Sequence, residues 1–266
     1  MMASATENQS YLWPFPIKRK FEDQTLLIDI VKGTDDIESV LRLRHQVFKE
    51  ELHCGESAES GLDQDAYDAF CDHLIITNID TGEIVGTYRL LQRSVAERNI
   101  GFYSANEFDL SVIIDQKISF CETGRACIRQ QYRGQTMINM LWLGLGRYAD
   151  YYHIRYLGGC TTIGSKVEDA IAIYRYAELT DAIIEAPFNA ITANPDNKIP
   201  DFKPQGVEIN ITEVKRSIPA LLRGYFSLGI KLCPEPAYDP DFGVIDFFTI
   251  IDLETTQRRI TRFTNG

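Results

Sequence analysis

Residues 118–154, which read ISFCETGRACIRQQYRGQTMINMLWLGLGRYADYYHI, decide the fold of this chain. Residues 118–128 are rich in β-forming side chains and are interrupted by Gly124, whereas residues 134–154 carry apolar side chains along one side of a helix. A turn that contains Arg133 and Gly134 connects the two segments. The pattern predicts a strand, a turn and an amphipathic helix, in that order.

This order of elements is suited to phosphate binding, because backbone N–H groups of the turn and of the helix N-terminus attract an anion. Arg125, Arg129 and Arg133 add positive charge to the same region. The alternative is that they are ordinary surface residues beside a turn. Since the chain has a formal net charge of -11, we expect an anionic carrier to dock at this local basic patch.

Composition places the 266-residue chain among globular proteins, with 44% hydrophobic and 24% charged residues. Its net negative charge argues against general nucleic-acid binding, because a phosphate backbone would be repelled. The six cysteines form no C-x-x-C pair, and no histidines stand at zinc-ligand spacing. We therefore expect reduced thiols in a cytosolic protein, and no metal site.

The sequence has no run of about 18 apolar residues, and its first residues lack the features of a signal peptide. We expect a cytoplasmic protein, and peripheral contact with the inner face of the membrane stays open. Residues 1–21 are expected to form an N-terminal arm, because their Trp-Pro-Phe-Pro segment is too rich in proline for a helix or an inner strand. Residues 22–266 are expected to form a single domain.

Apolar periodicity predicts further elements on both sides of the central segment. We expect strands at residues 26–31, 74–79, 84–91 and 156–162, helices at residues 37–52 and 167–179, and further strand and helix pieces up to residues 244–253. The strands at 74–79 and 84–91 flank a turn with Gly82, which is typical of an antiparallel hairpin. Residues 54–73 hold six carboxylates without Lys or Arg, which favours a loop.

The stretch Y-R-G-Q-T-M-I at residues 132–138 resembles the acyl-carrier signature of the GNAT acyltransferases. Members that use acetyl-CoA place small residues where this chain has Thr136 and Ile138. Relatives that take acyl groups from acyl carrier protein share this departure. The resemblance implies that the carrier is bound by Arg129, Arg133, Gly134, Gln135 and Thr136.

Four more motifs resemble those of acyl-homoserine-lactone synthases and ornithine lipid N-acyltransferases, in the same order along the chain. They supply Arg44 and Phe48 in the first helix, Asp65 and Asp68 in the acidic loop, Arg89 on a strand, and Glu122 with Arg125 on the catalytic strand. The resemblance covers residues 26–253. It implies an α/β (α+β) fold of the GNAT type, in which helices flank a twisted, mixed and mainly antiparallel sheet.

The segments G-T-Y-R-L-L at residues 86–91 and P-E-P-A-Y-D-P-D-F-G at residues 234–243 are more similar to the ornithine lipid N-acyltransferases. This resemblance implies transfer of a 3-hydroxyacyl chain from acyl carrier protein to the α-amine of L-ornithine or a similar amino acid. The implied partners are acyl carrier protein and the amino acid. The implied co-substrate is a phosphopantetheine thioester or an acyl-CoA, with no tightly bound cofactor.

Acyl transfer to an amine requires a proton acceptor, and Glu122 is the candidate. Glu122 and Arg125 would face opposite sides of a flat strand, because side chains alternate with period two. We therefore predict a bulge at or beside Gly124 that brings both to one face and frees a backbone N–H for the thioester carbonyl. The alternative is that the two form a structural ion pair.

An acceptor with two ammonium groups needs an acidic pocket, for which Asp65 and Asp68 are the candidates. Arg89 either pairs with the acceptor carboxylate or orders the acidic loop, and Arg44 is expected to brace that loop. Residues 218–232 are apolar enough to line an acyl groove, although core packing explains them equally well. The rival functions are an acetyl-CoA-dependent N-acetyltransferase, an acyl-homoserine-lactone synthase, and a non-catalytic lipid or acyl-carrier binding protein.

Overall fold

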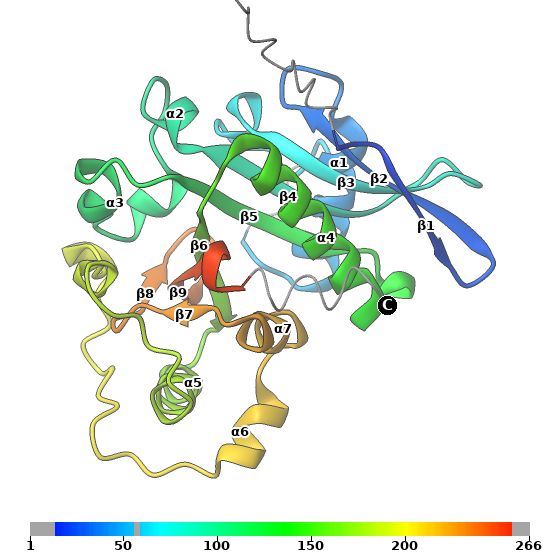
Figure 1. Ribbon diagram of the computed structural model, residues 1–266. Coiled ribbons are helices and arrows are strands. Elements are labelled where there is room, and N and C mark those ends of the chain that lie inside the picture. Colours follow the sequence, from blue (N-terminus) through cyan, green and yellow to red (C-terminus); the bar gives the residue numbers. More distant parts are fainter. Residues whose placement is uncertain (1–13, 56–58, 257–266) are drawn as a thin grey trace, which may run out of the picture.

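A twisted sheet of nine strands forms the centre of the protein over residues 14–55 and 59–256, which the computed structural model describes (Figure 1). The strands are β1 (Ile17–Phe21), β2 (Gln24–Lys32), β3 (Asp72–Asn78), β4 (Ile84–Gln92), β5 (Phe120–Ile128), β6 (Tyr156–Gly164), β7 (Lys231–Leu232), β8 (Ala237–Asp239) and β9 (Val244–Asp252). Their order is β1-β2-β3-β4-β5-β6-β9-β7, and β8 also pairs with β9. The expected mixed and mainly antiparallel sheet is confirmed.

Strands β5 and β6 are parallel, whereas the other neighbouring pairs of the described sheet are antiparallel. The parallel pairing is short, because it joins only residues 120–122 to residues 156–158 although both strands continue for several residues. The two strands therefore separate towards their carboxyl ends.

Helices cover both faces of the sheet (Figure 1). On one face, α4 (Gln135–Tyr152) packs across β2, β3 and β4, with α7 (Ala220–Leu228) beside it. On the other face, α1 (Glu38–His45) packs against β4 and β5. Further helices are α2 (Arg93–Ala96), α3 (Ser111–Asp115), α5 (Val167–Leu179) and α6 (Ile211–Ser217). Among the described residues, no helix is both long enough and apolar enough to cross a lipid bilayer.

Strand β3 shows how the sequence fills both faces. Leu74 and Ile76 are buried in the cluster that includes Leu141 of α4, whereas Ile75 between them packs with Val40 of α1. Because side chains alternate along a strand, such an unbroken apolar run belongs to a strand that is covered on both sides. The hairpin of β3 and β4 lies where the sequence predicts it.

Two boundaries differ from the sequence expectation. Residues 17–21 form the edge strand β1 instead of part of an arm, because the prolines end at Pro16 and an edge strand pairs on one side only. The rest of the expected arm, residues 1–13, lies outside the described residues. The helix expected at 37–52 is α-helical only to His45, and a π-helix (Gln46–Glu51) continues it.

Two glycines allow β6 to approach its neighbours closely. A Cβ atom at Gly158 would lie 2.5 Å from the backbone oxygen of Thr249 in β9. A Cβ atom at Gly159 would meet the backbone oxygen of Thr123 in β5 at a still shorter distance. Both contacts are with backbone atoms, so an added Cβ could be accommodated only if a strand shifted. These glycines therefore hold β5, β6 and β9 together at the point where β5 and β6 begin to separate.

The substitution Gly158→Ala should lower the free energy of unfolding by about 1–3 kcal/mol, because the added Cβ is forced against the backbone of β9. The matched control is Gly124→Ala in β5, where a Cβ meets nothing within 4 Å and the change should stay below about 0.5 kcal/mol. Urea unfolding followed by circular dichroism measures both. Equal stabilities of the two variants would show that β6 is not confined in this way.

Candidate active site

A cavity of about 270 Å³ opens where β5 and β6 separate. Its lining comes from both faces of the sheet. One part is polar and includes Tyr103, Glu122, Arg125, Asp239 and Asp246, and the other is apolar and includes Trp142, Leu157, Leu222, Tyr225 and Ile251. The cavity is therefore suited to a ligand with a charged head and an apolar chain.

Strand β5 contains the predicted bulge. The register of β4 and β5 shifts between Thr87 and Arg89, so that two residues of β5 stand opposite one residue of β4. The residue with left-handed backbone is Arg125, at a φ of 51°, and not the neighbouring Gly124. The bulge brings Glu122 and Arg125 to the same cavity, as predicted.

The carboxylate of Glu122 is buried and is held by the main chain. Its Oε2 accepts the N–H of Tyr103 at 2.8 Å, and its Oε1 accepts the N–H of Ser104 at 2.7 Å. Both donors belong to the short 3-10 helix Tyr103–Asn106. Burial raises the pKa of Glu122 above its ordinary value, although these hydrogen bonds act in the opposite direction. A carboxylate with a raised pKa is a stronger base, as removal of a proton from an ammonium group requires.

Arg125 contacts the acidic loop and not Glu122. Its Nη2 donates to Asp65 Oδ2 at 3.2 Å, and its Nε lies 3.5 Å from Asp63 Oδ2. Its guanidinium carbon lies 4.6 Å from the ring centroid of Phe242. The Glu122–Arg125 ion pair that the sequence raised as an alternative is therefore replaced by separate partners on separate elements.

Buried ion pairs hold the acidic loop in place. Arg44 is only 1% exposed and donates to Asp63 at 2.8 Å and to Asp68 at 2.6 Å. Arg89 donates to Asp65 at 2.6 Å and to Asp68 at 3.1 Å. Burial would raise the pKa of Asp68, but the charges of Arg44 and Arg89 outweigh burial and lower it to about 2. The loop is thus fixed by charged groups that depend on one another.

The predicted substrate-binding residues divide into two groups, those that line the cavity and those that do not. Phe48 and Arg89 line the cavity. Arg44, Asp65 and Asp68 lie outside that lining, so Arg44 braces the loop as expected. Asp65 reaches the cavity only through its contacts with arginines. The acidic loop therefore does not supply the acids of the cavity, because its carboxylates are already paired with guanidinium groups.

Besides Glu122, two carboxylates that line the cavity were not singled out as site residues by the sequence motifs. Asp239 and Asp246 belong to the lining, and Asp246 is 4% exposed. Glu107 is 3% exposed, and its carboxylate lies within 4.8 Å of that of Asp246. The signal for Asp246 in the sequence is one acid inside the apolar run V-I-D-F-F at residues 244–248, since a buried carboxylate needs a partner.

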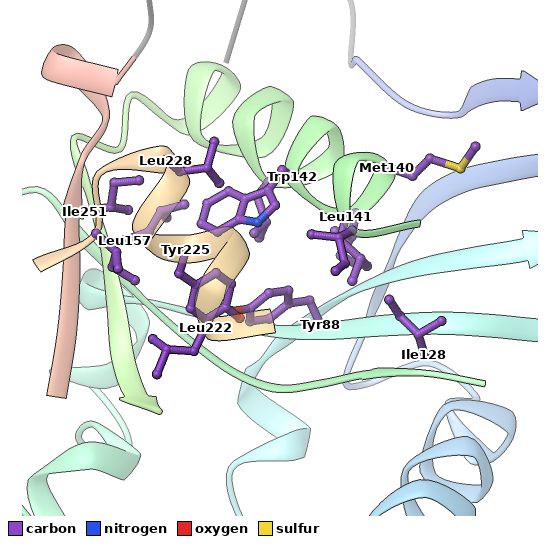
Figure 2. Close-up of a cluster of buried hydrophobic side chains, with 14 of the residues drawn as sticks. Tyr88, Ile128, Met140, Leu141, Trp142, Leu157, Leu222, Tyr225, Leu228 and Ile251 are labelled. Atoms are coloured by element: carbon purple, nitrogen blue, oxygen red, sulfur yellow. The ribbon is translucent and has the colours of Figure 1, made fainter. Parts of the chain in front are cut away.

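The apolar part of the cavity lies between the sheet and helices α4 and α7. Figure 2 shows Trp142 of α4 next to Tyr225 of α7, and their ring centroids are 5.4 Å apart. The hydroxyl groups of Tyr88 and Tyr225 lie 2.5 Å apart and satisfy each other within this apolar surface. Of residues 218–232, which were expected to line an acyl groove, the cavity is lined by Pro219, Leu221, Leu222, Tyr225 and Ile230.

The predicted carrier-binding segment forms the exposed N-terminus of α4. Gly134 is the N-cap residue and forms no side-chain cap, and Gln135 and Thr136 are exposed in the first turn. The helix follows the carboxyl end of β5, at the edge of the sheet where β5 and β6 separate. Its first N–H groups therefore face solvent near the opening between the two strands.

The three arginines around this turn do not form one cluster. Arg125 turns to the acidic loop, Arg129 donates to Gln46 Oε1 at 2.9 Å, and Arg133 pairs with Glu51. The expectation of a concentrated basic patch is corrected, because each of the three arginines contacts a different polar or acidic partner. Arg133, with 41% of its side chain exposed, is the most accessible of the three to a carrier.

The substitution Asp68→Asn should lower the free energy of unfolding by about 3–5 kcal/mol, because it leaves the buried guanidinium of Arg44 with one charged partner fewer. Glu38→Gln is the matched control, since the Arg42–Glu38 pair is exposed and is worth less than about 1 kcal/mol. Urea unfolding measures both variants. A loss in Asp68→Asn no larger than that in Glu38→Gln would contradict the structural role of this network.

Comparison with known proteins agrees with this arrangement. Residues 43–143 match the family model described as an acetyltransferase (GNAT) domain. An L-ornithine N(alpha)-acyltransferase of Rhizobium meliloti (strain 1021) is 31% identical over 84% of this chain and 79% of its own length. An L-ornithine N(alpha)-acyltransferase of Agrobacterium fabrum (strain C58) is 27% identical over 91% of this chain and 86% of its own length.

Solved structures share the fold. FeeM, an N-acyl amino acid synthase from uncultured soil microbes, has a TM-score of 0.52 at 10% identity and covers 88% of this chain and 95% of its own. The AHL synthase LasI has a TM-score of 0.51 at 15% identity, with 89% and 94% covered. Sequence and fold together show that the chain is a GNAT acyltransferase that belongs to the family of the L-ornithine N(alpha)-acyltransferases.

Proposed function

We propose that the protein transfers a 3-hydroxyacyl group from acyl carrier protein to the α-amine of L-ornithine or a similar amino acid, the first step of ornithine lipid synthesis. The observation that carries this proposal is the position of Glu122, a buried carboxylate at the wall of a cavity with a polar and an apolar part. An acyl chain and an amino acid that meet beside Glu122 match this division. The names of the relatives above support ornithine as the acceptor.

The cavity residues provide the groups that acyl transfer needs. Glu122 accepts a proton from the α-ammonium, directly or through water, and the free amine attacks the thioester carbonyl as the thiol leaves. A backbone N–H at the bulge beside Gly124 polarises that carbonyl. Arg125 holds the acceptor carboxylate, since its guanidinium lines the cavity and its buried Nε, 3.5 Å from Asp63 Oδ2, makes no hydrogen bond among the described residues.

The N-terminus of α4 supports the assignment of the donor. The phosphate of a phosphopantetheine arm fits the exposed N–H groups of Gln135 and Thr136, with Arg129 and Arg133 nearby. Thr136 stands at a position where the members that use acetyl-CoA have a small residue. The arm then runs along the opening between β5 and β6 and brings its thioester to Glu122.

The proposal is tested with the purified full-length protein and a panel of substrates. The donors are a 3-hydroxyacyl thioester of acyl carrier protein, the same acyl-CoA and acetyl-CoA, and the amines are ornithine, lysine and S-adenosylmethionine. Mass spectrometry should find α-N-acylornithine formed from the carrier thioester. Products from acetyl-CoA alone would overturn the carrier assignment, and a homoserine lactone formed from S-adenosylmethionine would overturn the acceptor.

Glu122→Gln should lower kcat at least about 100-fold, because an amide does not accept the proton of the attacking ammonium. Initial rates of thiol release measure the effect, and thermal unfolding verifies that the variant is folded. The exposed acid Glu208 provides the matched control, as Glu208→Gln should leave the rate unchanged. Full turnover by folded Glu122→Gln would show that Glu122 is not the proton acceptor.

Arg133→Glu should raise KM for the carrier-protein thioester about tenfold, because it reverses an exposed charge beside the carrier phosphate. The N-acetylcysteamine thioester of the same acyl chain lacks phosphate and protein, so its KM should not change. Arg98→Glu, at another exposed arginine, is the control and should affect neither substrate. Equal increases for both thioesters would show that Arg133 does not contact the carrier.

A further inference from the structure

The cavity contains carboxylates for which the acyl-transfer chemistry has no use. Asp239 and Asp246 line it, and Glu107, which is not part of the lining, has a carboxylate oxygen within 4.8 Å of one of Asp246. Glu107 Oε2 and Asp246 Oδ1 are buried, and neither has a hydrogen-bond partner among the described residues. A buried carboxylate oxygen without a donor is costly, so the arrangement favours a ligand that brings N–H donors and positive charge.

The charges around these two oxygens also favour a cation. Burial, followed by repulsion from Asp246, raises the pKa of Glu107, and burial likewise raises the pKa of Asp246. The two arginines of the cavity wall, Arg89 and Arg125, already pair with Asp65 of the acidic loop. These raised pKa values favour protonated carboxyl groups in the empty cavity, and a positively charged ligand group between Glu107 and Asp246 would stabilise their ionised forms.

The spacing of the two carboxylates fits one ammonium group. Their ligand oxygens lie within 4.8 Å of each other. A tetrahedral nitrogen that donates two hydrogen bonds of ordinary length bridges acceptors about 4.7 Å apart. The other oxygen of Glu107 already accepts from Cys160 Sγ at 3.3 Å, which leaves Oε2 free for the ligand.

The distance from Glu122 fits a diamino acid. Glu122 pairs with Gly158 of β6, and Cys160, which contacts Glu107, is two residues further along the same face of that strand. Two residues of a strand span about 7 Å. The two nitrogens of extended ornithine are separated by five bonds and lie about 6 Å apart.

We propose that Glu107 and Asp246 bind the side-chain ammonium of the acceptor and thereby select a diamino acid over a neutral amino acid of the same length. The inference rests on the proposed function, because the α-amine of the same molecule lies at Glu122. Asp239 adds negative charge to the same wall of the cavity. The selected class of acceptor is thus an amino acid with a cationic group about three carbons from Cα.

The test compares L-ornithine with L-norvaline, which has the same carbon chain without the second amino group. With the full-length protein and one acyl donor, kcat/KM should be at least about 100-fold higher for ornithine. Asp246→Asn, a change that keeps shape and removes the charge, should reduce this ratio at least tenfold, and Glu107→Gln should act in the same direction. The ratio should be unchanged in Asp169→Asn, which alters an exposed acid of α5.

Direct binding separates this inference from the proposed function. Isothermal titration should show ornithine binding about tenfold more weakly to Asp246→Asn than to the unaltered protein, with norvaline binding weakly to both. This result without turnover of any thioester would refute the proposed function and keep the ammonium site. Equal kcat/KM values for ornithine and norvaline in the unaltered protein would refute the ammonium site and keep acyl transfer.

Metal analysis tests for the other cation that such a group of side chains accepts, a metal ion. Glu107, Cys160 and Asp246 are spaced closely enough to hold a metal ion. We expect elemental analysis of the purified protein to find no stoichiometric divalent metal, and ornithine selectivity to survive treatment with a chelator. A bound metal that is lost in Asp246→Asn would overturn the inference.

Discussion

The functional part of the structure depends on one constraint. The parallel pairing between β5 and β6 stops after residue 122. If the two strands stayed paired, their side chains would close the sheet and leave no room for a ligand. Close approach at Gly158 and Gly159 fixes where the pairing ends, and the bulge at Arg125 bends β5 away beyond that point. The cavity is therefore a consequence of backbone geometry before any side-chain chemistry is considered.

The position of the split also explains the two-sided character of the cavity. Alternation along β5 and β6 directs one set of side chains towards α4 and α7, where Trp142, Leu157 and Tyr225 form an apolar wall. The other set faces the polar side with Glu122. The cavity therefore combines both environments, and Glu122 lies at its wall.

Charge is divided between two sites that serve different purposes. The aspartates of the acidic loop pair with the buried Arg44 and Arg89 and with the partly buried Arg125, so these ion pairs fix the shape of the loop. The carboxylates on the polar wall, such as Asp246, lack such partners and keep the cavity acidic. The negative charge that arginines do not neutralise is therefore at the cavity wall and not in the acidic loop.

The sequence by itself determined the strand, turn and helix of residues 118–154, the hairpin before them and the bulge beside Gly124. These features depend on periodicity and on neighbouring residues, which are local. Through motif resemblance it also indicated Glu122 as a candidate proton acceptor. Only the tertiary structure decided which carboxylates are free, because Asp68 is neutralised by Arg44 from a distant helix. Glu107 and Asp246 meet across 139 residues of chain, and no local pattern records such a contact.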